Sequence, residues 1–146
     1  MKIAGILILL ALVTLSSSCS KCETGDFFTG EIVENSIVRS WSNAPGQRVI
    51  RSASDFGAEL EMSLNGGQSY SPVNFELYSV LAFPTVSNCA GTFTRDVTFD
   101  EANQMVIYKI TINNCTDCTG QVGQSNFVLT RKIPENFTVN FELVSN

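Results

Sequence analysis

The sequence predicts a single α+β domain that is mostly antiparallel β-sheet and carries one amphipathic helix. Three observations support this fold class. The chain has 146 residues, which is the length of one ordinary domain. Apolar and polar residues alternate in several short segments, as they do in a strand with one buried face. Only one segment outside the N-terminus has helical spacing, so the helix is an addition to a β-rich domain.

The clearest strands form a predicted hairpin over residues 92–112. The alternating apolar residues of its two arms are Phe93, Val97 and Phe99, then Val106, Tyr108, Ile110 and Ile112. Residues 100–104 between the arms are polar and have the composition of a turn. Matching the apolar faces places Phe93 opposite Ile110 or Ile112, and Val97 opposite Val106 or Tyr108.

Other apolar segments predict the remaining strands. They are residues 27–38 (one or two short strands), 48–51, 73–83, 126–131 and 137–143. Residues 73–83 are apolar at both parities, which indicates a central strand covered on both faces and ended by Pro84. Residues 137–143 alternate strictly, so they predict a C-terminal strand with one face in water.

Residues 52–64 predict the helix. Ser52 and Asp55 have the spacing of a capping box, with Asp in place of the usual Glu. The expected core-facing stripe consists of Phe56, Leu60 and Leu64. The Asn-Gly-Gly sequence at 65–67 is expected to end the helix, because these residues tolerate a positive φ.

The first 18 residues have the layout of a secretory signal peptide. Lys2 supplies a positive start, residues 3–13 are apolar, and residues 14–18 include the small residues expected before a cleavage point. The apolar run is too short to cross a hydrocarbon core, which needs about 20 residues. We therefore expect the segment to be removed and not to remain as a transmembrane helix.

The residues around Cys19 resemble the lipobox of bacterial lipoproteins. Leu15 lies four residues before Cys19, and Ser16 stands where the common lipobox has Leu. The resemblance implies cleavage before Cys19, diacylglycerol on its sulfur and a further acyl chain, such as palmitate, on its amine. Residues 20–23 are similar to the short Lys/acidic signal that sends such lipoproteins to the cell surface. The alternative is an ordinary secretory signal with Cys19 in a disulfide.

This interpretation divides the chain into three parts. Residues 1–18 form the signal peptide, 19–26 the lipid-anchored tether and 27–146 the β-rich ectodomain. The expected location is the cell envelope, as an outer-membrane lipoprotein that can be exposed on the cell surface. Because several acyl chains hold a protein stably at a bilayer, a tether of this length keeps the domain close to its membrane.

Four further cysteines are disulfide candidates: Cys22, Cys89, Cys115 and Cys118. An even number in an oxidising compartment predicts two disulfides, and three pairings are open. Extending the hairpin register brings Cys89 within reach of Cys115 or Cys118, and the remaining cysteine could pair with Cys22. Cys115 and Cys118 also have the spacing of a thiol–disulfide exchange motif. They follow a predicted strand and enter a predicted loop at 119–123, which favours a structural disulfide.

The order of the later segments resembles the C-terminal domain of the protease-complex subunit PrcB. The matching motifs are residues 48–52 leading to Asp55-Phe56, residues 72–76 before a buried strand at 79–83, residues 126–129, residues 132–134 and residues 139–141. The family often has Gly-Gly-Tyr after the central strand, where this chain has residues 84–93. The resemblance spans roughly residues 48–143. It implies a non-catalytic exported domain that binds or stabilises a protease, and it supplies no catalytic residues.

Composition excludes several classes of function. The net charge of -5 argues against nucleic acid as a partner. The absence of histidine excludes Ser-His-Asp and Cys-His catalysis and His-ligated zinc or haem. Asp96, Asp100 and Asp117 could hold a hard cation, but they lack EF-hand spacing, and no carboxylate pair is placed for glycoside hydrolysis. We therefore expect no enzymatic activity, no cofactor and no metal.

Binding is the function that remains. We expect the lipid to attach the protein to the membrane, and we expect the partner to be an envelope protein, such as a protease. Trp41 lies beside a Pro-Gly turn and is a candidate aromatic anchor. Its alternative role is a core tryptophan that caps the sheet. Pro84 and Asn88 are candidates within an expected loop, 84–91, that a disulfide would stiffen. The alternative function is a surface module that binds glycans or cations.

Overall fold

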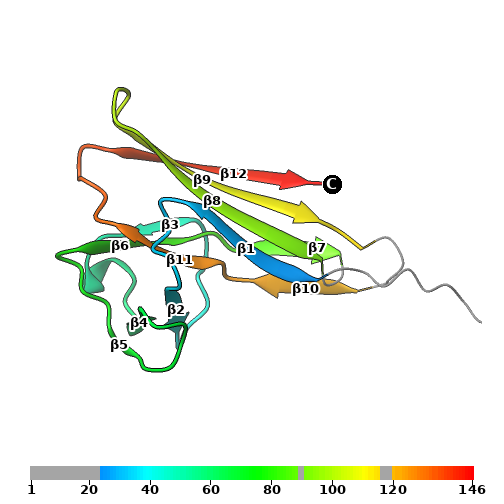
Figure 1. Cartoon of the computed structure of the whole chain (residues 1–146), viewed down its shortest axis with the longest axis horizontal. Helices are drawn as coiled ribbons and strands as arrows, with labels where there is room; N and C mark the ends of the chain where they lie inside the picture. Colours follow the sequence, from blue (N-terminus) through cyan, green and yellow to red (C-terminus); the bar gives the residue numbers. More distant parts are fainter. Residues whose placement is uncertain (1–23, 89–90, 116–119) are drawn as a thin grey trace, which may run out of the picture.

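The computed structural model describes residues 24–88, 91–115 and 120–146, and they form two packed layers of β-strand (Figure 1). The strands are β1 (Gly25–Gly30), β2 (Ile37–Ser40), β3 (Arg48–Ile50), β4 (Leu60–Ser63), β5 (Ser71–Pro72), β6 (Tyr78–Ala82), β7 (Thr85–Asn88), β8 (Thr92–Asp100), β9 (Met105–Asn113), β10 (Gln121–Gln124), β11 (Phe127–Arg131) and β12 (Thr138–Ser145). A single 3-10 turn, η1, spans Ala53–Asp55. The described chain is therefore mostly β-strand.

The first layer is a four-stranded sheet with the order β1-β8-β9-β12. Its centre is the β8–β9 hairpin, in which Phe93 lies opposite Ile112 and Val97 opposite Tyr108. These pairs confirm the predicted hairpin register. The turn is held by Asp100, whose carboxylate accepts hydrogen bonds from the backbone N–H (3.0 Å) and side-chain amide (2.7 Å) of Asn103. The two outer strands pair in parallel, β1 with β8 and β12 with β9.

The second layer contains three small antiparallel sheets, β11-β6-β3, β10-β7 and β2-β4-β5. The central strand predicted within 73–83 is confirmed as β6, although only Tyr78–Ala82 are extended. Leu81 of β6 faces the core shared with the first layer, whereas Val80 and Ala82 face a second core toward β3 and β4. Both faces of β6 are thus buried, as its two apolar parities indicate.

The predicted helix over 52–64 is wrong. The capping residues act as expected, since the Asp55 carboxylate accepts hydrogen bonds from the N–H groups of Arg51 (2.7 Å) and Ser52 (2.9 Å). Gly57, however, has a φ of 70°, which ends the helical turn after η1. Leu60 and the following residues instead form β4 between β2 and β5. The α+β class is therefore corrected to a mostly β fold.

Two predicted loops are also wrong in part. Within 84–91, residues Thr85–Asn88 form β7, and within 119–123, residues Gln121–Gly123 belong to β10. The two strands pair with each other, with Val122 opposite Ser87. Sequence composition suggested loops because both segments are rich in small and polar residues. Their pairing depends on a contact between distant parts of the chain, which local composition does not report.

β1 includes Gly25 and Asp26, which the sequence interpretation assigned to the tether, so from here on the ectodomain denotes residues 24–146 and contains the whole strand. The signal peptide, the lipidation candidate Cys19 and the cysteines at 22, 89 and 118 lie outside the described residues. Cys115 is disulfide-bonded, and its partner also lies outside them. In the portion of the chain that the structure describes, no helix has the length and apolar character needed to cross a membrane.

Candidate functional site

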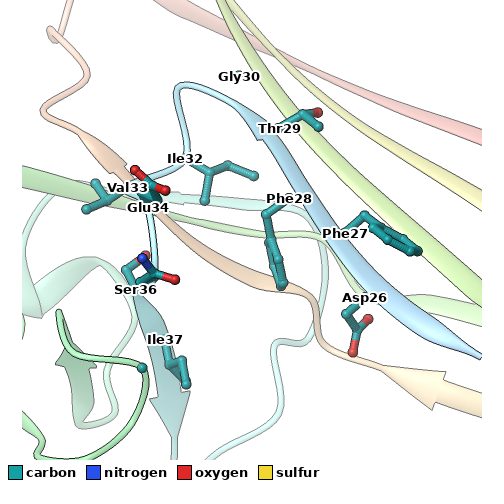
Figure 2. A pocket seen from close by; sticks show the side chains of 12 residues that line it. Asp26, Phe27, Phe28, Thr29, Gly30, Ile32, Val33, Glu34, Ser36 and Ile37 are labelled. Atoms are coloured by element: carbon teal, nitrogen blue, oxygen red, sulfur yellow. The ribbon is translucent and has the colours of Figure 1, made fainter.

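An open groove lies beside β1, between this strand, the segment leading into β2 and the start of β11 (Figure 2). Two adjoining hollows form it, with volumes of about 750 and 440 Å³. Both hollows are lined by Asp26, Phe28, Ile32, Ser36 and Ile37. The smaller hollow is also lined by Phe127, Val128 and Leu129 of β11. The groove therefore has an apolar wall with a few polar groups, which is the usual character of a binding site.

Two adjacent phenylalanines explain how β1 forms this wall. Phe27 and Phe28 must project to opposite faces of the strand, and Phe28 points into the groove toward β11 while Phe27 points away (Figure 2). Their side chains are 56% and 53% exposed. Burying a phenylalanine side chain stabilises a protein by roughly 1.5–3 kcal/mol. Two rings left in water on one short strand are therefore an unusual feature that indicates an interaction surface.

The polar end of the groove is organised by Arg95. This residue lies on the core-facing side of β8 and is only 5% exposed. Its Nε and Nη2 donate to Asn126 Oδ1 at 3.0 and 2.6 Å, and Nη2 also donates to Gln124 Oε1 at 2.8 Å. Its Nη1 contacts the Asp26 carboxylate of β1 at 2.6 Å. The buried positive charge is thus paired, as its burial requires.

Asn126 makes this arrangement possible through its own conformation. Its φ of 43° is in the left-handed region, which asparagine tolerates better than most residues. In this position its Nδ2 donates to the Phe83 carbonyl at 2.9 Å and to Thr85 Oγ1 at 2.7 Å. The same side chain therefore holds Arg95 through its oxygen and the β6–β7 connection through its nitrogen. The Arg95 guanidinium lies 5.2 Å from the Phe28 ring centre, which links the network to the groove wall.

The three predicted partner-binding residues do not line the groove. Trp41 follows the end of β2 and is 71% exposed, so its alternative role as a core residue is wrong. The Arg39 guanidinium lies 5.1 Å from the Trp41 ring centre and 3.8 Å from that of Tyr70. Pro84 is half-buried between β6 and β7, and Asn88 is exposed at the end of β7. The structure therefore does not bring the three together.

The acidic residues considered for a cation are engaged separately. The Asp96 carboxylate accepts hydrogen bonds from Thr29 Oγ1 (2.6 Å) and Thr98 Oγ1 (3.1 Å). Asp100 caps the β8–β9 turn, and hydrogen bonds from the Asn103 side chain and backbone lower its pKa. Asp117 lies outside the described residues. Across residues 24–88, 91–115 and 120–146, no three metal-ligating side chains gather at one point.

Sequence reasoning missed the residues that form the groove, although two signals were present. Arg95 occupies the same parity as Phe93 and Val97, so it is a charge on the buried face of an otherwise apolar strand. Such a residue needs buried partners and marks a polar site. The Phe27-Phe28 pair is the second signal, because adjacent aromatic residues in a strand cannot both face the same core.

Comparisons of the chain with protein-family models, with curated proteins and with solved structures found no match.

Proposed function

We propose that this protein is a lipid-anchored protein of the cell envelope whose domain binds a protein partner through the groove beside β1, without catalysis. The observation that carries this proposal is the exposed Phe28 ring above a groove whose opposite wall includes Ile32 and Ile37. Apolar side chains that are accessible in a groove release water when a partner covers them, and aromatic residues are enriched at such contacts.

The surroundings of the groove favour a binding role. Arg95 is engaged by Asp26, Gln124 and Asn126, so its donors hold the wall of the groove in place. A preformed wall lowers the ordering cost of association. The resemblance to PrcB suggests a peptidase or a subunit of a peptidase complex as the partner. The lipid at Cys19 would hold the groove close to the envelope proteins from which that partner comes.

The alternative is a module that binds glycans, and the exposed Trp41 ring is the observation that favours it. A flat aromatic face in water offers a packing surface for the apolar face of a sugar ring. Trp41 already has Arg39 beside it, and it is 71% exposed. The two functions therefore use different surfaces, and single substitutions can separate them.

The test is site-specific photo-cross-linking in native membranes. A photoreactive phenylalanine analogue is placed at Phe28, at Trp41 or, as a matched control, at Lys109 on the outer face of the first sheet. Cross-linked proteins are then identified by mass spectrometry. We expect a defined protein from position 28 and none from position 109. Equal labelling at positions 28 and 109, or no protein at position 28, would contradict the proposal.

The alternative is tested with the purified ectodomain. Retention on immobilised envelope polysaccharide, elution by free sugars and loss of retention in Trp41→Ala together would establish glycan binding. A measurable turnover of peptide, ester or glycoside substrates by a clean sample would contradict the non-catalytic role.

A further inference from the structure

Within residues 24–88, 91–115 and 120–146, the groove is bordered by strands whose outer edges carry no neighbouring strand. Among these residues, β1 is the end strand of its sheet and pairs only with β8, and β2 is the end strand of its own sheet and pairs only with β4. β11 is likewise the outer strand beside β6. An open strand edge presents N–H and C=O groups that can pair with another extended chain.

A single backbone contact shows which groups of β1 face outward. The Glu31 N–H donates to the Val97 carbonyl at 2.7 Å, so Glu31 faces β8. In a parallel ladder the residues of one strand alternate between facing the neighbour and facing away. Phe27 and Thr29 therefore direct their backbone groups to β8. Asp26 and Phe28 direct theirs to the open edge, on the side of the groove.

On the opposite side of the groove, part of the edge of β11 is also open. The Val33 N–H donates to the Leu129 carbonyl at 2.9 Å, and Ile32 pairs with Thr130, so the segment before β2 covers the later part of the β11 edge. Phe127 lies two residues before Leu129 and has the same parity. Its backbone groups therefore face the groove beyond the point where the covering segment ends.

The charges at the groove indicate the chemistry of the occupant. Among the described lining residues, the only cation is Arg95, and Asp26 neutralises it. Glu34 is exposed on the wall opposite Phe28, and no hydrogen bond or ion pair engages it within residues 24–88, 91–115 and 120–146. The groove thus combines open backbone edges, apolar side chains and the Glu34 carboxylate, which has no partner among the described residues. An extended peptide with apolar residues and a nearby Lys or Arg complements all three.

We infer that an extended segment of a partner protein adds to the open edge of β1 as a fifth strand, with an apolar side chain against Phe28 and Ile37 and a basic side chain at Glu34. This inference rests on the proposed protein-binding function and specifies its mode. Pairing through the backbone gives affinity, and alternate side chains give specificity. The Phe28 N–H and C=O form the central pair of hydrogen bonds with the added strand.

The test uses an array of nine-residue synthetic peptides in which Val, Ile or Phe alternates with Thr, with Lys at both ends. A second array of the same peptides carries Glu at the ends. Binding to the ectodomain is measured for the wild type, Phe28→Ala and Phe28→Pro. Both substitutions remove the phenylalanine ring, but only Phe28→Pro also removes the backbone N–H of residue 28. Because this N–H faces the open edge, its loss leaves the pairing of β1 with β8 unchanged. Circular dichroism and urea unfolding check that both variants are folded.

We expect the Lys-ended peptides to bind and the Glu-ended peptides to bind at least about tenfold more weakly. Phe28→Pro should bind about tenfold more weakly than Phe28→Ala, the difference corresponding to one backbone hydrogen bond. If Phe28→Pro fails to fold, the wild type is tested with peptides methylated at alternate backbone nitrogens. Methylation in one of the two alternate sets should abolish binding, because only one set faces β1.

Four outcomes would overturn the inference. Backbone pairing would be excluded if Phe28→Ala and Phe28→Pro bound the peptides equally well. It would also be excluded if both methylated sets of peptides bound as well as the unmethylated peptides. Self-association of the ectodomain that Phe28→Pro abolishes would assign the open edge to a second copy of the chain. Absence of peptide binding, together with a protein cross-linked at position 28, would reject strand addition but leave the proposed function intact.

Discussion

A single buried guanidinium connects the groove to the core, and this makes Arg95 the most sensitive residue of the site. It joins β8 to β1 through Asp26, to the end of β10 through Gln124 and to the residue before β11 through Asn126. Lysine carries the same charge but has one donor group at a single point, so it cannot serve three acceptors in different directions.

Arg95→Lys is expected to lower the free energy of unfolding by about 2 kcal/mol, because the buried Asn126 Oδ1 and the partly buried Gln124 Oε1 lose their donors. Asp26 is largely exposed and contributes less to this loss. Urea denaturation measures the change, and Arg39→Lys, at an exposed ion pair, is the matched control with a loss below about 1 kcal/mol. Equal losses in the two variants would show that the Arg95 network does not stabilise the domain.

The buried phenol of Tyr108 makes the stability of the domain depend on pH at alkaline values. Burial raises the pKa of Tyr108 well above its usual value of about 10. The folded state therefore keeps the phenol proton where the unfolded state releases it, so stability is present below pH 10 and falls as pH rises above it. In Tyr108→Phe this alkaline loss, up to about 1.4 kcal/mol per pH unit, should disappear. Urea titrations between pH 8 and 11 measure it, and an unchanged slope in Tyr108→Phe would contradict the prediction.

The β8–β9 hairpin and β6 could be predicted because the local pattern of apolar residues in these strands indicates which faces are buried. Val97 and Tyr108 face each other for that reason. The local sequence could not exclude the predicted helix over 52–64, because Phe56 and Leu60 have helical spacing. The left-handed Gly57 between them, and pairing of β4 with two distant strands, decide the outcome. The parallel pairing of β1 with β8 is equally non-local, so no sequence pattern within β1 reports it.

The position of β1 depends on Gly30, the last residue of the strand. Its φ is 71°, and a Cβ built there would lie 2.2 Å from the Val97 carbonyl oxygen and 2.9 Å from Asp96 Oδ1. Gly30→Ala is therefore expected to lower the free energy of unfolding by about 2 kcal/mol, through the left-handed conformation and the clash. The loss should be accompanied by faster hydrogen exchange at Thr29 and Glu31, which face β8.

The control for this prediction is Gly123→Ala in β10, where an added Cβ meets nothing within 4 Å. It should change the free energy of unfolding by less than about 0.5 kcal/mol. If Gly30→Ala is as stable as the control and keeps the exchange protection of β1, the close approach between β1 and β8 is not what holds the strand.

At the scale of the whole molecule, the groove exists because three sheets end at one place. β1, β2 and β11 belong to different sheets, and each contributes its outer edge. No single segment of the sequence contains this arrangement, which is why local patterns point to Trp41, Pro84 and Asn88 and not to Phe28. Composition could exclude histidine chemistry and nucleic acid, since those conclusions need only counts of residues. The site depends on the relative placement of residues that lie far apart in the sequence, such as Asp26 and Asn126, which both contact Arg95.

The proposed anchor would hold this groove at a membrane, so removing the anchor should release the protein from the membrane. Three acyl chains at Cys19 would hold the protein stably, because each buried methylene contributes about 0.8 kcal/mol. We expect the wild type to remain in the membrane pellet after a high-salt wash and to be released by detergent, whereas Cys19→Ala is released without detergent. Cys22→Ser is the matched control and should stay in the pellet. The intact mass of the processed protein should show the added diacylglycerol and acyl chain. An unmodified or disulfide-bonded Cys19 would contradict the anchor, yet peptide binding by the ectodomain would be unaffected, because the groove is formed by residues from Asp26 onward.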